Sequence, residues 1–258
     1  MALAHAHVSF LLEAAARGCF PYGIPAMLEF GEQEWFGDIG VSDLPRIAAL
    51  CQRDPGFVAW VQQQSLVLND KSKTFEVAKL FYQIIFGIRD YLAIDLHGTQ
   101  ASLPYDLNHP VSLDRRFEVT TNIGTAEHIF NQAQFFRNMH DLTLPGGIMY
   151  HALPNQGCYD HGFYNYHPTF LFDLCAANSY QILMFSYVDS SVKPSRLVPI
   201  ASREAYVEMA LESRLSAYSG LMLLARRTTD GAFVVPQQAY YGTELSPALR
   251  EAWSKLDR

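Results

Sequence analysis

Several side chains that can move protons or bind metal ions gather in one stretch of the sequence, 157-GCYDHGFYNYHPTF-170. Asp160, His161 and His167 lie here among tyrosines that include Tyr164. Histidine is suited to acid–base catalysis because its ordinary pKa lies near neutral pH, and it is a common metal ligand. Tyrosine rings with polar hydroxyl groups can line a small-molecule site. The stretch is therefore a candidate metal site, a candidate catalytic surface or an aromatic loop packed against the core.

A second candidate group is the pair Glu127-His128, which opens a helical pattern over 127-EHIFNQAQFFRNMHDLT-143. In a catalytic role, His128 would take a proton from an acceptor oxygen or nitrogen. In a structural role, Glu127 would favour the helix N-terminus and His128 would bond to a neighbouring loop. Both interpretations stay open. For His140 and His151 we expect structural roles within the helix and the strand that contain them.

The metal-ligand candidates are Asp160, His161 and His167, with His128 or His151 within reach. Such nitrogen and oxygen ligands suit zinc, iron or manganese. None of these pairs has the i, i+4 helical spacing or the compact motif that identifies a metal site. We therefore expect no metal site.

The composition argues against several classes of protein. The 258 residues suit one well-buried domain, and the net charge of −7 disfavours a nucleic-acid or membrane-surface role, because phosphate groups attract basic surfaces. The four cysteines are scattered along the chain, which gives neither a zinc ribbon nor a disulfide framework. This cysteine usage favours the cytoplasm.

Residues 1–24 are interpreted as an N-terminal helical cap. The stretch lacks a basic first segment and carries Glu13 and Arg17 within its apolar run, so it does not resemble a signal peptide. No uninterrupted apolar run in the sequence reaches the roughly 18–20 residues that span a bilayer. Val8 and Leu11 fall on one side of a helix, which predicts an amphipathic helix that ends at Gly18.

From about residue 25 onward, short apolar runs alternate with helical patterns, and this alternation predicts a mostly parallel sheet with helices on both faces. The expected strands are 26–30, 91–95, 103–107, 117–123, 148–153, 180–189 and 219–227. The expected helices are 73–86, 127–143, 168–179 and 203–218, and residues 38–72 are interpreted as a helical insertion after the first strand. The order predicts a single domain, 1–258, with a doubly wound, seven-stranded Rossmann-like α/β sheet, whose ligands bind beyond the carboxyl ends of the strands.

The segment 116-RFEVTTNIGTAEHIFNQAQFFRNMHDLTLPGGIMYHALP-154 contains a strand, a helix that begins with Glu-His, and the turn 144-LPGG-147 into the next strand. In these features the chain, from about Pro25 to Arg227, resembles the class I S-adenosylmethionine-dependent methyltransferases. The resemblance implies a Rossmann-like fold, S-adenosyl-L-methionine as cofactor, and transfer of its methyl group to an acceptor.

The resemblance also implies roles for residues at the strand ends. A glycine after the first strand lets the backbone pass close to the cofactor, and an acidic residue after the second strand can accept hydrogen bonds from both ribose hydroxyls. The implied positions are Glu29, Gly31 and Glu32 at the methionine end, Asp95 at the ribose, Asp106 and Leu107 at the adenine, and Asn122 and Gly124 where the sulfonium meets the acceptor.

The sequence departs from the family pattern at the first turn. The usual G-x-G-x-G is reduced to Gly31, which Glu-Gln-Glu follows. An alternative alignment places the glycine turn at 93-AIDLHG-98 and makes Asp106 the ribose acid. That alignment leaves too few residues for a helix and a strand between the two positions, so the first alignment is preferred.

We therefore expect a cytoplasmic enzyme that methylates a small molecule, with oxygen favoured over nitrogen and carbon as the acceptor atom. The expected catalytic residues are Glu127, His128, His161 and Tyr164. The expected partner is the small acceptor, with no nucleic acid and no membrane, and a homo-oligomer stays open. Two alternatives remain: an enzyme of this fold with a metal-dependent or cyclising reaction, and a non-catalytic methyltransferase-like subunit.

Overall fold

The computed structural model describes residues 2–70, 72–239, 246–248, 251 and 255. Its strands are β1 (Ala2–Leu3), β2 (Ala26–Phe30), β3 (Glu34–Trp35), β4 (Asp90–Ile94), β5 (Ser102–Leu103), β6 (Phe117–Ile123), β7 (Thr143–Gln156), β8 (Tyr180–Asp189), β9 (Arg196–Pro199) and β10 (Ser219–Arg227). Its α-helices are α1 (His5–Ala16), α2 (Leu44–Leu50), α3 (Pro55–Val67), α4 (Thr74–Phe86), α5 (Gln132–Leu142), α6 (Pro168–Ala177) and α7 (Arg203–Leu211). Two 3₁₀ turns, η1 (Val41–Asp43) and η2 (Ala126–His128), complete the described elements.

The central sheet has eight strands in the order β5-β4-β2-β6-β7-β10-β8-β9. The neighbours from β5 to β7 are parallel, whereas β10 is antiparallel to both β7 and β8. The expected doubly wound, mostly parallel α/β sheet is therefore confirmed. The strand order reverses between β2 and β6, and ligands of such sheets bind at this reversal, beyond the carboxyl ends of the strands.

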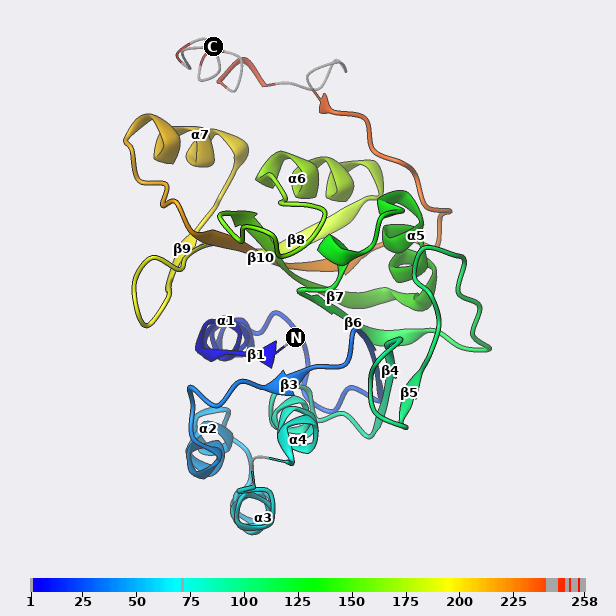
Figure 1. Ribbon diagram of the computed structural model, residues 1–258, viewed down its shortest axis with the longest axis vertical. Helices are drawn as coiled ribbons and strands as arrows, with labels where there is room; N and C mark the ends of the chain where they lie inside the picture. Colours follow the sequence, from blue (N-terminus) through cyan, green and yellow to red (C-terminus); the bar gives the residue numbers. More distant parts are fainter. Residues whose placement is uncertain (1, 71, 240–245, 249–250, 252–254, 256–258) are drawn as a thin grey trace.

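Helices cover both faces of the sheet, with α1 and α4 on one face and α5, α6 and α7 on the other (Figure 1). Side chains that alternate along β7 reach both layers: Tyr150 joins the core beneath α1 and α4, and Met149 joins the core beneath α5 and α6. A fully buried large apolar side chain stabilises a fold by about 1.5–3 kcal/mol relative to an exposed one. These two cores hold the strand ends in place.

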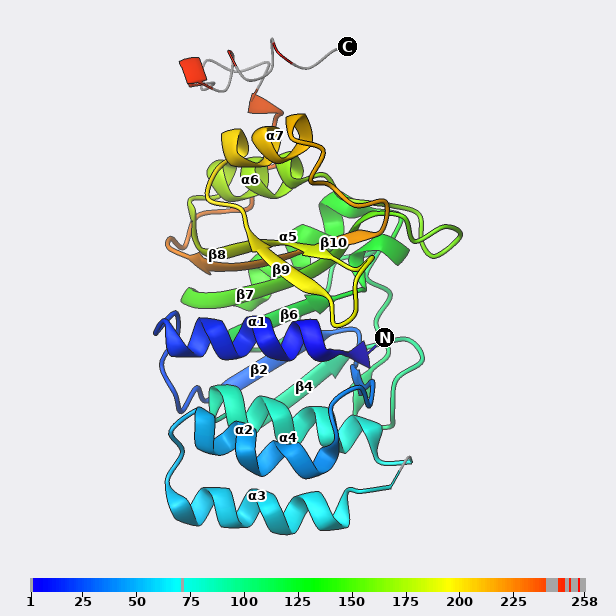
Figure 2. The same ribbon diagram turned by 90° about the vertical axis from the view of Figure 1, so that its left-hand side faces the viewer.

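The N-terminal helix α1 lies beside α4 over the same face of the sheet, and α3 lies farther from the sheet than either (Figures 1 and 2). The ring of Phe10 stacks on Tyr150 with their centroids 5.4 Å apart. Before α1, strand β1 pairs in parallel with β3, so that Ala2 faces Glu34. The start of the chain is thus fixed next to the turn that follows β2. Among the described residues, no helix is both long and apolar enough to cross a membrane.

Three strand predictions are corrected. The sheet has eight strands rather than seven, because the short 196-RLVP-199 adds β9 at the edge. The strand expected over 103–107 is only β5, since Pro104 has no N–H to continue the ladder. The turn expected at 145–147 is part of the continuous strand β7, which accommodates it by a shift in its register with β6.

Two helix predictions are also corrected. The helix expected over 127–143 begins only at Gln132. The Gln132 side chain donates to the carbonyls of Ala126 and Ile129, and the Asn131 side chain caps the helix start. The helix expected over 203–218 ends at Leu211, where Arg214 N–H bonds back to the Met209 carbonyl. From the sequence we expect a loop and a short helix after residue 227; residues 228–239 form the loop, and most of the residues beyond them lie outside the described part of the chain.

Candidate functional site

A cleft of about 430 Å³ lies beyond the carboxyl ends of β6 and β7 and the adjoining start of β10. We call it the β6–β7 cleft. Its polar lining includes His7 from α1 and Glu127, Cys158 and His161 from the turns beyond the strands. Its apolar lining includes Ile123, Leu153, Leu221 and Met222. The cleft therefore joins titratable groups to an apolar wall at the ligand end of the sheet.

The turn after β6 is shaped by the side chain of Asn122. Its Oδ1 accepts a hydrogen bond from Ala126 N–H (3.0 Å), and its Nδ2 donates to His151 Nδ1 (3.2 Å). Gly124 adopts a positive φ of 65° and donates its N–H to the Ala152 carbonyl (2.8 Å). This reversal carries the chain into η2, so that Glu127 and His128 emerge at the edge of the sheet.

The loop after β7 is held against the same turn. Phe163 N–H donates to the Glu127 carbonyl (2.7 Å), and the Tyr164 hydroxyl donates to the Phe130 carbonyl (3.0 Å). Gly162 allows this approach, because a Cβ at that position would lie only 2.9 Å from the Glu127 carbonyl oxygen. These contacts bring His161 to Glu127.

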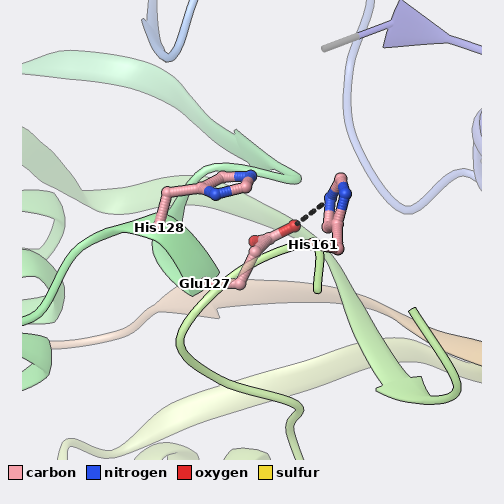
Figure 3. Close-up of side chains that lie close together, drawn as sticks. All are labelled: Glu127, His128 and His161. Atoms are coloured by element: carbon pink, nitrogen blue, oxygen red, sulfur yellow. Dashed lines mark ion pairs between the residues drawn. The ribbon is translucent and has the colours of Figure 1, made fainter. Parts of the chain in front are cut away.

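Glu127, His128 and His161 form a cluster whose side chains point toward one another (Figure 3). One potential ligand atom from each residue lies within 4.8 Å of the others, and His161 Nε2 is 3.7 Å from Glu127 Oε1. The rings of His128 and His161 have their centroids 4.9 Å apart. His161 is exposed and His128 is partly buried, whereas Glu127 is only 1% exposed.

Burial controls the acidity of this cluster. Loss of hydration raises the pKa of Glu127 to about 7. Burial, followed by the charge of the neighbouring His161, lowers the pKa of His128. Glu127 can therefore give or accept a proton near neutral pH. The cluster has the composition needed for general acid–base chemistry or for binding a metal ion.

Of the four residues expected to be catalytic, three meet in this cluster and Tyr164 does not. Its hydroxyl is bonded to the Phe130 carbonyl, where it ties the loop down. The metal-ligand candidates Asp160 and His167 also lie apart from the cluster as the structure describes it: His167 Nδ1 instead meets Thr169 at the start of α6. His140 and His151 are buried, and His140 bonds to Tyr180 and to the Gly231 carbonyl.

The residues expected at the methionine end of the cofactor have partners within the protein. Glu29 is fully buried and accepts hydrogen bonds from the hydroxyls of Tyr82 and Tyr91, and burial raises its pKa to about 7. The Glu32 carboxylate accepts from Thr99 and Ser102 and pairs with Lys79. Both acids therefore brace the turn around Gly31.

The residues expected at the ribose and adenine are nearer the surface. Asp95 lies directly after β4 and accepts from the N–H groups of Glu32 (2.9 Å) and His97 (2.8 Å). The side chain of Asp106 is 43% exposed, and its Oδ2 lies 3.7 Å from His109 Nε2. Leu107 is instead buried in the core beneath α5.

Gln33 is a residue of this region that the sequence interpretation does not select. Its Nε2 donates to two backbone carbonyls, those of Gly31 (2.9 Å) and Ile123 (3.0 Å), across the point where the strand order reverses. Its Oε1 is buried and has no partner among the described residues. His7 and Cys158 in the β6–β7 cleft were missed for a similar reason, because no motif connects them to it.

A larger hollow of about 670 Å³ lies between α6, α7 and residues 236–238. Its two charged lining residues are Asp173 and Arg203. The Asp173 and Arg203 side chains of this hollow pair with each other.

No family model matches the chain, and no curated protein matches its sequence. Solved structures that resemble it include the N-methyltransferase NodS from Bradyrhizobium japonicum in complex with S-adenosyl-L-homocysteine, at 12% identity over 87% of each chain with a TM-score of 0.46. Another is the O-methyltransferase of a polyketide synthase multienzyme of Brevibacillus brevis, also with S-adenosyl-L-homocysteine, at 12% identity over 88% of this chain and 73% of that one (TM-score 0.40). A third is the [4+2]-cyclase SpnF, at 13% identity over 88% and 83% (TM-score 0.41). At these identities the likeness concerns the fold alone.

Proposed function

We propose that the protein, as a single domain over 1–258, transfers the methyl group of S-adenosylmethionine to a small molecule. One observation carries the proposal: the carbonyls of Gly31 and Ile123 converge on one nitrogen donor at the reversal of the strand order. In this fold the reversal is where ligands bind. The side-chain amide of Gln33 occupies this position. In the complex, the α-ammonium group of the cofactor's methionine part would displace the amide and donate to the same two carbonyls.

The groups around this position fit the rest of the cofactor. A carboxylate can accept about four hydrogen bonds. Asp95 accepts two of them from the N–H groups of Glu32 and His97, so it can accept two more from the ribose hydroxyls. The half-exposed Asp106 offers Oδ2 to an adenine amine. Glu29 and Glu32 would support the Gly31 turn from behind, since their carboxylates are already bonded to neighbouring side chains. Leu107 would contribute through the core and not by touching the ring.

The β6–β7 cleft fits the acceptor. Its volume of about 430 Å³ lies within the roughly 300–1,000 Å³ of small-molecule pockets. Glu127 and His161 line it, and either can take a proton from an acceptor hydroxyl, which favours oxygen as the acceptor atom. Its apolar wall would exclude water and hold the acceptor in line with the methyl donor.

Calorimetric titration with S-adenosylmethionine and S-adenosylhomocysteine tests the proposal. We expect both to bind at one site per chain. Asp95→Asn removes a charged acceptor, so we expect binding about 10- to 100-fold weaker. Asp114→Asn, a change at an exposed aspartate, is the matched control and should bind like the wild type. Absence of binding to both ligands would contradict the proposed function.

A further inference from the structure

We infer that Glu127, His128 and His161 form a binding site for a divalent transition-metal ion, with zinc as the ion that suits it best. Two imidazoles and one carboxylate are the ligand set of many zinc sites that keep a position open for chemistry. Imidazole ligands favour zinc, copper, iron and nickel over magnesium and calcium, which prefer oxygen. This site differs from the sequence expectation of no metal, and it uses neither Asp160 nor His167.

The separations of the ligand atoms suit a single ion. Two ligands that each lie about 2.1 Å from zinc are at most about 4.2 Å apart. His161 Nε2 and Glu127 Oε1 are 3.7 Å apart, within that limit. All three ligand atoms lie within 4.8 Å of one another, and a rotation of the His128 ring would close the remaining difference.

Glu127 supplies the second, independent observation. The residue is 1% exposed, and its Oε2 has no hydrogen-bond partner among the described residues. A buried carboxylate oxygen without a partner is costly, and such groups in native proteins are paired or coordinate metals. A cation that both oxygens of the Glu127 carboxylate bind would give Oε2 the partner that it lacks.

The surrounding backbone holds the ligands in place. Glu127 and His128 come from η2 and His161 from the loop after β7, and the bond from Phe163 N–H to the Glu127 carbonyl connects these two segments. A second connection is made by the hydroxyl of Tyr166, which donates to Gln132 Oε1 (2.6 Å). Such supporting contacts keep metal ligands oriented before the ion arrives.

The ion would face the β6–β7 cleft. Glu127 and His161 both line that cleft, whereas His128 does not belong to its lining. With three protein ligands, a tetrahedral zinc ion keeps one position for water or for an oxygen of a bound molecule. Zinc binding can be tested separately from cofactor binding, because none of the three ligands belongs to the proposed cofactor site. Glu127 and His161 do line the proposed acceptor cleft, so with zinc bound they would act as ligands and not as bases.

Zinc binding by the full-length, untagged protein tests the inference. The protein is first stripped with a chelator and then titrated with zinc against a chromophoric competitor, without S-adenosylmethionine. We expect one zinc ion per chain. His161→Ala removes an exposed ring and leaves the fold intact, and Glu127→Gln keeps the shape of a buried side chain while removing its charge. Each should weaken zinc binding by at least about tenfold, since even supporting residues of metal sites cost this much.

His97→Ala is the matched control, because it removes an exposed histidine outside the cluster and should bind zinc like the wild type. Far-UV circular dichroism of the stripped proteins checks that each variant is folded. The inference is overturned if the wild type binds no zinc, or if folded His161→Ala and Glu127→Gln both bind zinc as the wild type does.

Discussion

The backbone N–H of Phe163 donates a hydrogen bond to the carbonyl of Glu127, with 2.7 Å between nitrogen and oxygen. This bond joins the loop after β7 to the turn after β6. It determines where His161 lies relative to Glu127, and so it determines the geometry of the cluster. The first prediction tests how closely the two segments must approach.

Gly162→Ala should disturb this contact. The added Cβ would lie 2.9 Å from the Glu127 carbonyl oxygen and 3.0 Å from its Cγ, so the loop must move away. We expect a loss of about 1–3 kcal/mol in the free energy of unfolding, measured by urea denaturation, together with weaker zinc binding. Gly231→Ala is the control, because its Cβ would meet nothing closer than 3.7 Å. Equal stability of the two variants would show that the loop at Gly162 has room for a Cβ next to Glu127.

Asn122→Ala should destabilise the protein through the turn after β6. The change removes the acceptor of Ala126 N–H and the donor to His151 Nδ1, and all of these groups are buried. Each buried polar group left without a partner costs about 1–3 kcal/mol, so we expect a total loss of about 2–6 kcal/mol in urea denaturation. The exposed Asn69→Ala should stay within about 0.5 kcal/mol of the wild type. A small effect at Asn122 would mean that water replaces its amide.

Gln33→Ala should strengthen the binding of S-adenosylhomocysteine if the cofactor proposal is right. In the wild type the ligand must first displace the Gln33 amide from the carbonyls of Gly31 and Ile123. Each of these two hydrogen bonds has a net worth of about 1 kcal/mol, so the removal of both should tighten binding by about 30-fold in calorimetry. Weaker binding would instead assign Gln33 to the support of the turn.

His151 should make stability depend on pH in the acid range. Burial lowers its pKa from 6.5 to about 3, so between these values the unfolded chain binds a proton that the folded protein does not. Stability contributed by neutral His151 is thus complete above about pH 6.5 and is lost as the pH falls toward 3. One such group gives a slope of about 1.4 kcal/mol per pH unit in the free energy of unfolding. His151→Gln should reduce this slope in denaturation measured between pH 6 and pH 4, and an unchanged slope would count against a buried, neutral imidazole.

The sequence predicts the strands of this protein better than the junctions between them. Strand β2 and strands β8 and β10 match the expected ranges residue for residue, because their apolar runs are bounded by polar residues and glycine. The helix expected at 127–143 begins late, at Gln132, because the Gln132 side chain bonds to the carbonyls of Ala126 and Ile129. Whether a side chain bonds to backbone carbonyls depends on its position in space, and the periodicity of apolar residues does not predict that position.

The candidate site is predictable only in part, for the same reason. Glu127, His128 and His161 were selected because parallel strands deliver their following turns to one edge of the sheet. The sequence places His128 within reach of His161, but it does not predict that Glu127 joins them and that Asp160 and His167 lie apart, since these residues form no short ligand motif. Gln33 was missed because a glutamine after a glycine has no distinctive chemistry until the carbonyls that it meets are known.

The short ladder between β1 and β3 connects the two proposed binding regions. Ala2 lines the β6–β7 cleft and pairs with Glu34, which follows Gln33 directly in the chain. Displacement of Gln33 by the cofactor would therefore move backbone that borders the acceptor site. The affinities for cofactor and acceptor should then be linked. Saturation with the cofactor should change the dissociation constant of the acceptor by the same factor as saturation with the acceptor changes that of the cofactor.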